Sequence, residues 1–323
     1  MSGQLTPMIV QSTEKEPRPV VLGRFAPSPS GRFHVGNIFS SMVAALVADE
    51  IILRIEDLDP DRSKQQFIDC VKRDLEWFGF TWVGKVLYQS ANDRQEAYRV
   101  ACEQLEQAGY VYPCFCSRAD LHSARAPHVG EEFVYQNTCK FLSDEERKNR
   151  SLVRDPALRL DVSGAAPERF TDRFQGECSF DLEKESGDFI IRRSDGVFAY
   201  QLAVVLDDAA SGINSVVRGA DLLSSTPKQL YLQELLGLPK PNYGHVPIFV
   251  DEQERKLSKR NKDASLSFLI DELKMNAREI LGYLAWISGI ISEFQPMSLE
   301  ELKRFANLDA LNGKRQIVWK APL

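Results

Sequence analysis

The apolar and polar positions in the first third of the chain predict alternating strands and helices. Val20 to Leu22 is a short apolar run that predicts a buried strand, and from Asn37 to Val47 apolar residues recur at helical spacing. The segment from Ile51 to Asp59 opens with a second apolar run and ends in carboxylates, which predicts a central strand. Strand, loop, helix and strand make a βαβ unit, so we expect a parallel sheet that binds its ligand at the carboxyl ends of its strands.

The rest of the chain contains further helical segments by the same criterion. Apolar spacing predicts helices over residues 64–77, 91–108, 265–292 and 298–305. The segment from Phe189 to Ala210 predicts a hairpin around Ser194-Asp195-Gly196, followed by an apolar element that periodicity does not assign to helix or strand. Residues 112–141 are irregular and contain three of the six cysteines, so this part of the chain is set apart from the sheet.

Composition and charge narrow the class of protein. The chain has 323 residues, 43% of them apolar and 27% charged, which are ordinary values for a globular enzyme of one or two domains. No apolar run approaches the ~20 residues of a membrane-spanning helix, and the first 20 residues lack the pattern of a signal peptide. We therefore expect a cytoplasmic protein without a membrane partner. The net charge of −6 argues against indiscriminate coating of nucleic acid, so an RNA partner would need a local basic surface.

The sequence "GRFAPSPSGRFHVGN", residues 23–37, predicts a ligand-binding loop that leads into a helix. Prolines and glycine exclude the interior of a strand or helix, and backbone N–H groups at a helix N-terminus attract phosphate. Gly31 and Gly36 allow a close approach to the ligand, and His34 can donate a hydrogen bond without a full charge. The loop matches neither G-x-x-x-x-G-K-[ST] nor G-x-G-x-x-G, so neither a P-loop ATPase nor an ordinary dehydrogenase is indicated.

A second basic motif, "KLSKR" at residues 256–260, gives this loop a more specific meaning. Alone, two lysines three residues apart are more often a solvated turn. Together with the first loop, they resemble the two ATP signatures of class I aminoacyl-tRNA synthetases. "LRIEDLDP", "FAYQLAVVLDD" and "VVRGADLLSSTPKQ" follow the first loop in the same order as in the catalytic domain of glutamyl-tRNA synthetases, and the resemblance runs from about Val21 to Arg260. It implies an α/β fold with a Rossmann-like parallel sheet.

The resemblance also implies the roles of individual residues in joining the carboxylate of L-glutamate to the α-phosphate of ATP, which is used with Mg²⁺. His34 and Lys259 coincide with the catalytic positions of that family. The resemblance implies that His34 holds the phosphates of ATP and that Lys259 stabilises the departing pyrophosphate. The positions implied for ATP are His34, Gly36, Asn37, Lys256 and Lys259. Those implied for glutamate are Arg24, Phe25, Ala26, Pro27, Ser28, Glu56, Tyr200 and Arg218. Taken singly, each arginine is better explained by an ordinary ion pair, and Tyr200 is equally well explained by a core position.

The cysteine-rich segment suggests a metal site. Cys114, Cys116 and Cys139 offer three sulfur ligands within a short span. The alternative is three buried cysteines that bind no common metal, which would give the same sequence pattern. On chemistry alone the fourth ligand would be His122 or His128. The spacing C-x-C followed by Y-x-x-x-C resembles the zinc site of short bacterial relatives of glutamyl-tRNA synthetase, which implies Tyr135 as the fourth ligand of a structural Zn²⁺. His122 remains the alternative.

The short segment after the KLSKR motif indicates which relatives the chain resembles. Only 63 residues follow Arg260, too few for an anticodon-binding domain. The chain therefore resembles short paralogues that activate glutamate without tRNA and transfer it to the queuosine base in the anticodon arm of tRNA(Asp). The alternatives are a truncated synthetase that charges a tRNA 3′ end and a catalytically idle relative. We expect a monomer.

Five segments are expected along the chain: a mobile tail (1–19), the first half of the catalytic domain (20–110), a zinc-containing insertion that resembles an acceptor-binding subdomain (111–188), the second half of the catalytic domain (189–264), and a truncated stem-contacting helical region (265–323).

Overall fold

The computed structural model describes residues 18–29, 31–61, 63–117, 120, 134–257 and 262–322. Most of the expected tail lies outside these residues. So do Lys259 and the two histidines considered as zinc ligands, His122 and His128.

A parallel sheet forms the centre of the protein. Strand β1 (Leu22–Phe25) pairs in parallel with β2 (Glu50–Ile55), and β2 pairs with the short β3 (Leu87–Tyr88). A second parallel pair, β9 (Ser215–Gly219) and β10 (Asn242–Val246), lies beside β1. The Asn214 N–H donates to Leu22 O, and Arg24 donates to Val217 O, so β1 and β9 also run in the same direction. The spatial order β3-β2-β1-β9-β10 brings the carboxyl ends of the strands to one edge.

Strand β1 begins two residues later than the strand predicted from Val20 to Leu22. Val20 is 55% exposed and precedes β1, because β1 begins only where Leu22 meets β2 and Asn214. The strand predicted from Ile51 is confirmed as β2. The three helices predicted in the first third are confirmed within two residues as α1 (Val35–Val47), α2 (Gln65–Trp77) and α3 (Asn92–Gln107).

The element that periodicity left open, after the hairpin near Gly196, is the helix α7 (Tyr200–Ala210). It packs between α3 and α8 (Ser225–Leu235), which explains why it is apolar on several sides. Between β9 and α8 lies the short helix η1 (Ala220–Leu222).

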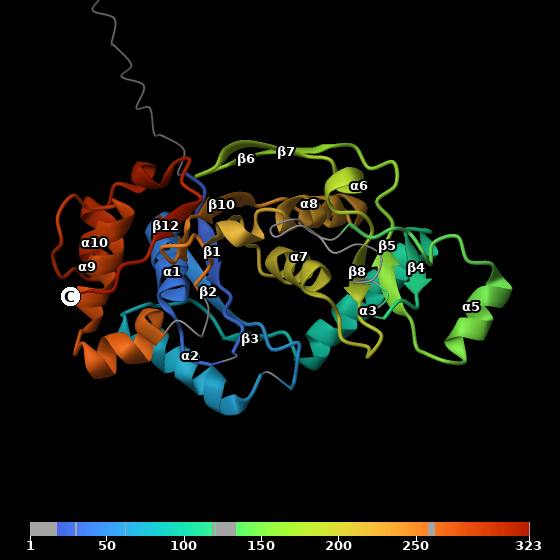
Figure 1. Cartoon of the computed structure of the whole chain (residues 1–323), viewed down its shortest axis with the longest axis horizontal. Helices are drawn as coiled ribbons and strands as arrows, with labels where there is room; N and C mark the ends of the chain where they lie inside the picture. The colour runs from blue at the N-terminus through green and yellow to red at the C-terminus, as the bar shows by residue number, and fades with distance from the viewer. Residues whose placement is uncertain are drawn as a thin grey trace, which may run out of the picture.

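The insertion forms the end of the molecule that lies opposite the C-terminal helices (Figure 1). Strands β4 (Val111–Cys114), β5 (Ala157–Leu160) and β8 (Phe189–Arg192) form an antiparallel sheet. The expected boundary at residue 188 therefore falls between two strands of one sheet. Helix α5 (Asp144–Ser151) leads from the cysteine segment toward β5, and α6 (Leu182–Glu185) precedes β8.

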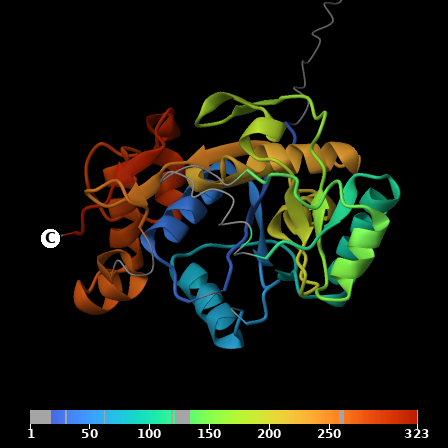
Figure 2. The ribbon, with the colours of Figure 1, turned by 45° about the vertical axis from the view of Figure 1, so that its right-hand side comes forward.

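A hairpin of β6 (Glu168–Asp172) and β7 (Gly176–Phe180) extends from the insertion back over the parallel sheet. It lies along β10 and α8 (Figures 1 and 2). The Arg173 N–H donates to Tyr243 O at 2.9 Å, which connects the hairpin to β10. A segment that follows the cysteines in sequence thus lies over the centre of the fold.

In the C-terminal part, the helices α9 (Ala277–Ser288) and α10 (Leu299–Phe305) both pack against α1. The helical segment predicted over 265–292 is confirmed with an interruption: the π-helical turn η3 (Phe268–Glu272) precedes α9, and residues 273–276 separate the two. The short helix η2 (Lys262–Ala264) lies before them. Lys274 adopts a left-handed conformation with φ of 55°, and Asn276 caps a new helix by accepting from the Glu279 N–H. Beyond α10, η4 (Leu308–Leu311) leads to β12 (Gln316–Val318), which pairs with β11 (Ile248–Val250).

The two largest hydrophobic cores support this arrangement. One joins the parallel sheet to α1, α2 and the C-terminal helices, and the other joins α3, α7 and the antiparallel sheet. None of the helices in the described part of the chain has both the length and the apolar character needed to span a bilayer.

Candidate active site

A cleft of about 860 Å³ opens where the carboxyl ends of β1, β2 and β9 meet the start of α1. Its lining contains all the residues that the sequence suggested for ATP and glutamate within the described ranges: Arg24, Phe25, Ala26, Pro27, Ser28, His34, Gly36, Asn37, Glu56, Tyr200, Arg218 and Lys256. The structure therefore brings together residues from five separate motifs. Lys259 lies outside the described residues.

His34 is held at the N-terminus of α1 by a reciprocal cap. Its Nδ1 accepts from the Gly36 N–H at 3.0 Å, and its own N–H donates to the Asn37 side chain at 3.2 Å. Since Nδ1 is an acceptor, the neutral ring carries its proton on Nε2. A Cβ on residue 36 would lie 2.9 Å from the His34 ring, so glycine is required there for this cap. The loop thus fixes a neutral donor beside the first turn of a helix.

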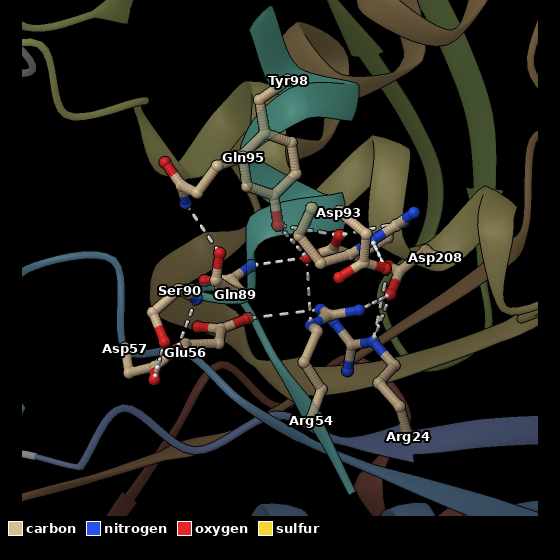
Figure 3. A network of polar contacts seen from close by, with 12 residues as sticks. Arg24, Arg54, Glu56, Asp57, Gln89, Ser90, Asp93, Gln95, Tyr98 and Asp208 are labelled. Carbon is tan, nitrogen blue, oxygen red and sulfur yellow. Dashed lines mark hydrogen bonds and ion pairs between the residues drawn. The ribbon is translucent and has the colours of Figure 1, made fainter. Parts of the chain in front are cut away.

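A cluster of buried ion pairs, shown in Figure 3, includes Arg24 and Glu56, which also line the cleft. Arg54, 1% exposed, donates to Asp208 at 2.5 Å and to Glu56 at 3.3 Å, and its Nε lies 3.8 Å from Asp207. Arg24 approaches the same Asp208 at 3.4 Å. Gln89 and Tyr98 donate to Asp207, each at 2.8 Å. Arg94 also lies 3.7 Å from Asp207. Three guanidinium groups therefore meet three carboxylates, one directly after β2 and two on α7.

The pKa shifts of the cluster follow from burial and charge. Burial raises the pKa of Glu56 above its ordinary value, although Arg54 and Arg24 oppose this. Burial acts on Asp208 in the same direction, but there the two arginines prevail and the pKa is lowered. Asp208 is thus the firmly ionised partner, whereas Glu56, at the cleft, would gain most from an additional cation.

Arg218 contrasts with this cluster, because its described partners are neutral. Its Nε donates to His245 Nε2 at 3.0 Å, and Nη2 donates to the Thr226 hydroxyl at 2.8 Å. Nη1 donates to Gln229 Oε1 at 2.9 Å and to the Tyr200 hydroxyl at 3.2 Å. Within the described residues no carboxylate lies at ion-pair distance from this guanidinium, which is 5% exposed and lines the cleft. An anionic ligand would supply the missing counter-charge.

Lys256 also lines the cleft. Its ammonium group contacts the Asp221 carboxylate, and both groups are partly exposed. Such a pair is readily exchanged for a ligand phosphate, because solvent-exposed ion pairs are weak.

The cysteine cluster lies in the insertion. The Sγ atoms of Cys114, Cys116 and Cys139 lie within 4.8 Å of one another, a group that could hold a metal ion. The Tyr135 hydroxyl is 3.4 Å from Cys114 Sγ and 3.6 Å from Cys116 Sγ. Arg159 donates to Cys114 Sγ at 3.2 Å and lies over the Tyr135 ring. Burial would raise the pKa of the Cys114 thiol, but Tyr135 and Arg159 lower it, whereas burial raises the pKa of Cys116 to about 12. Of these two thiols, Cys114 is therefore the one suited to bind as a thiolate without help from the metal.

Several residues of the site were not predicted from the sequence, although they lie within its motifs. Arg54 and the pair Asp207-Asp208 are charged residues within apolar runs, which was a usable signal for buried ion pairs. Thr226 and Gln229 follow the "RGADLL" stretch, and their contacts to Arg218 had no signal in the sequence.

Comparison with known proteins agrees with the fold and the cleft. Residues 20–307 match the family model described as tRNA synthetases class I (E and Q), catalytic domain, which defines the class of this protein. The fold resembles a glutamate-tRNA synthetase from Elizabethkingia anophelis, with a TM-score of 0.77 and 22% identity over 94% of this chain and 68% of that one. A glutamate tRNA ligase from Elizabethkingia meningosepticum, solved in complex with its amino acid, gives a TM-score of 0.76 at 23% identity.

Curated relatives define the family more narrowly. The chain is 45% identical to a glutamyl-Q tRNA(Asp) synthetase from Geobacter sulfurreducens, over 80% of this chain and 81% of the relative. It is 41% identical to another from Nitratidesulfovibrio vulgaris, over 86% and 89%. The chain belongs to the glutamyl-Q tRNA(Asp) synthetase family. The predicted class I fold and the predicted relationship are thereby confirmed.

Proposed function

We propose that the protein activates L-glutamate with ATP in the absence of tRNA and transfers it to the queuosine base in the anticodon arm of tRNA(Asp). The observation that carries this proposal is the convergence, in one cleft, of the helix-capped His34 loop, the acidic Glu56 and the uncompensated Arg218. The high coverage of curated relatives with this name gives further support.

The proposed first step joins two anions. A carboxylate oxygen of glutamate attacks the α-phosphorus of ATP, and the bond from that phosphorus to the bridging oxygen breaks, releasing pyrophosphate. The Arg218 guanidinium and Arg24 receive the side-chain carboxylate, Tyr200 donates to it, and Glu56 accepts from the α-ammonium group. Phe25 to Ser28 form the wall beside glutamate. The protein's part is to position the reactants and neutralise charge, since no protein nucleophile is required.

ATP is assigned to the other side of the cleft. His34 Nε2 and the first N–H groups of α1, including those of Gly36 and Asn37, would donate to the phosphates. Lys256 would exchange Asp221 for phosphate, and Lys259 would stabilise the departing pyrophosphate. Mg²⁺ would accompany ATP and neutralise part of its charge. His34 and Lys259 are therefore the proposed catalytic residues.

We also propose a structural Zn²⁺ held by Cys114, Cys116, Cys139 and Tyr135. A tetrahedral ion with Zn–S bonds of about 2.3 Å requires sulfur atoms roughly 3.8 Å apart, and the 3.6 Å between Cys116 Sγ and Cys139 Sγ supports this geometry. The four donors would fill the coordination shell, so the ion would shape the insertion rather than act on substrate. The five expected segments, a monomeric state and a cytoplasmic location remain part of the proposal.

The test is transfer of labelled glutamate to purified tRNA(Asp) with and without queuosine, beside tRNA(Glu). We expect label only on the queuosine-containing tRNA(Asp), and glutamate-dependent ATP–pyrophosphate exchange without any tRNA. Label on tRNA(Glu) would instead identify an enzyme that charges a tRNA 3′ end. Absence of exchange would identify an idle relative.

A further inference from the structure

A buried pair of side chains lies behind Arg218, on the side away from the cleft. His245, on β10, is fully buried, and Asp172, at the end of β6, is 2% exposed. The Asp172 Oδ2 atom lies 2.6 Å from His245 Nδ1, and His245 Nε2 accepts from Arg218 Nε at 3.0 Å. A continuous chain of hydrogen bonds therefore runs from the β6–β7 hairpin to the guanidinium in the cleft.

The hydrogen atoms in this chain can be placed by counting donors and acceptors. Arg218 has only donors, so His245 Nε2 must carry a lone pair. The Thr226 hydroxyl accepts from Arg218 Nη2 and lies 3.1 Å from His245 Nε2, to which it can donate. The ring proton is therefore on Nδ1, where it is donated to Asp172. Burial and the nearby Arg218 lower the pKa of His245, consistent with a neutral ring.

Asp172 is itself fixed by its backbone surroundings. Its Oδ1 accepts from the N–H groups of Phe174, Gln175 and His245 at 2.9–3.0 Å. Burial alone would raise the pKa of this carboxyl, but the hydrogen bonds from His245 lower it, so the group stays ionised. One carboxylate thus fixes the turn of the hairpin through Oδ1 and the histidine tautomer through Oδ2.

The chain also determines which edge of Arg218 faces the ligand. Nε is used by His245, and three of the four N–H bonds on the η nitrogens have partners on Thr226, Gln229 and Tyr200. The guanidinium plane is therefore fixed before a ligand arrives, with one Nη2–H lacking a partner among the described residues.

We infer that Asp172 and His245 are positioning residues for glutamate binding, which hold the guanidinium of Arg218 in the orientation that receives a carboxylate. The inference rests on the proposed role of Arg218. It assigns a function in substrate recognition to the β6–β7 hairpin, although none of the hairpin's residues lines the cleft.

Asp172→Asn tests the tautomer directly. The new amide oxygen can keep the three backbone contacts, but the amide group would donate to His245 Nδ1 and force the ring proton onto Nε2, against the Arg218 Nε–H. In glutamate-dependent ATP–pyrophosphate exchange, we expect KM for glutamate to rise about 10–100-fold and KM for ATP to change less than about twofold. If Asp172 had only a structural role, the substitution would change KM for glutamate and KM for ATP alike, or it would lower the unfolding temperature.

A matched pair at residue 245 separates the two contacts of the ring. The His245→Gln amide reaches the Nε2 position and can accept from Arg218, whereas His245→Asn reaches only the Nδ1 position. We expect H245N to behave like D172N and H245Q to restore most of the affinity for glutamate. The chain has four histidines, so ¹⁵N spectra of the imidazoles can identify the tautomer of His245 in the unsubstituted protein and its reversal in D172N.

Three results would overturn the inference in different ways. A proton on Nε2 in the unsubstituted protein would exclude the relay, and an unchanged KM for glutamate in folded D172N and H245N would exclude the positioning role. If the unsubstituted protein showed no glutamate-dependent exchange at all, the proposed function would fail, and the positioning role with it.

Discussion

Two buried arginines beside the same cleft are stabilised in opposite ways. Arg54 is surrounded by the carboxylates of Glu56, Asp207 and Asp208, whereas Arg218 is held by an imidazole, an amide and two hydroxyl groups. Both side chains are almost completely withdrawn from solvent. They therefore bear a similar cost of desolvation, but of the two only Arg54 has carboxylates at ion-pair distance among the described residues.

The difference assigns the two regions different tasks. The Arg54 cluster joins β2, whose apolar residues belong to one hydrophobic core, to α7, whose apolar residues belong to the other. It is a structural junction that also holds Glu56 and Arg24 at the cleft. Arg218 is well oriented but lacks a counter-charge among the described residues, which suits a group whose partner arrives with the substrate.

The largest effect is expected from Arg54→Met. Removal of this guanidinium leaves three buried carboxylates with too little positive charge, which typically costs about 3–5 kcal/mol of unfolding free energy. Urea unfolding monitored by circular dichroism measures this loss. A loss below about 1 kcal/mol would contradict the role of Arg54 as the junction between the cores.

The same variant should lose less stability at acid pH. In the unsubstituted protein, the lowered pKa of Asp208 contributes stability above the unfolded pKa, and this is lost as pH falls through the folded value. Without Arg54, the carboxyl groups have raised pKa values, so protonation stabilises the folded variant. The difference between the two proteins should therefore narrow from about pH 8 to about pH 5.

The second effect is expected from Arg218→Gln, and it should appear in binding rather than in stability. Loss of a charge-assisted contact to the substrate carboxylate should raise KM for glutamate about 30–150-fold, equivalent to about 2–3 kcal/mol. Arg218→Lys keeps the charge without the planar fork and should be intermediate. We expect both variants to have an unfolding free energy close to that of the unsubstituted protein. If either variant lost as much unfolding free energy as R54M, Arg218 would be a structural group like Arg54, and the comparison would fail.

Part of the cleft could be predicted from the sequence, and part of it could not. The loop through His34, the order of the motifs and the gathering of Arg24, Glu56 and Arg218 could be predicted, because βαβ topology brings the strand ends together. The partners of Arg218 could not be predicted, since Asp172 and His245 are 73 residues apart and meet only because the hairpin extends over β10. The break at Lys274 was missed because apolar periodicity continues on both sides of it.

Another buried arginine, outside the cleft, sharpens the comparison. Arg159 contacts Cys114 Sγ and the Asp188 carbonyl, so its counter-charge depends on whether the cysteines are thiolates. If the cysteines bind Zn²⁺ as proposed, Arg159→Gln removes a positive charge beside the thiolates and should lower the affinity for Zn²⁺ about tenfold. Competition with a chromogenic chelator measures this affinity, while KM for glutamate should not change. Unaltered zinc affinity would show that Arg159 serves only to pack over Tyr135.

The smallest effect is expected from Arg99→Ala, which separates burial from the number of ion pairs. Arg99 on α3 contacts Glu96 at 2.6 Å and also contacts Glu103, but its side chain is 47% exposed. Water already solvates these charges, and ordering the side chains opposes the attraction, so such pairs contribute little. Urea unfolding of R99A should be indistinguishable from that of the unsubstituted protein. If R99A were instead as unstable as R54M, the number of carboxylate partners rather than their burial would determine stability, and Arg218 could no longer be distinguished from Arg54 by its surroundings.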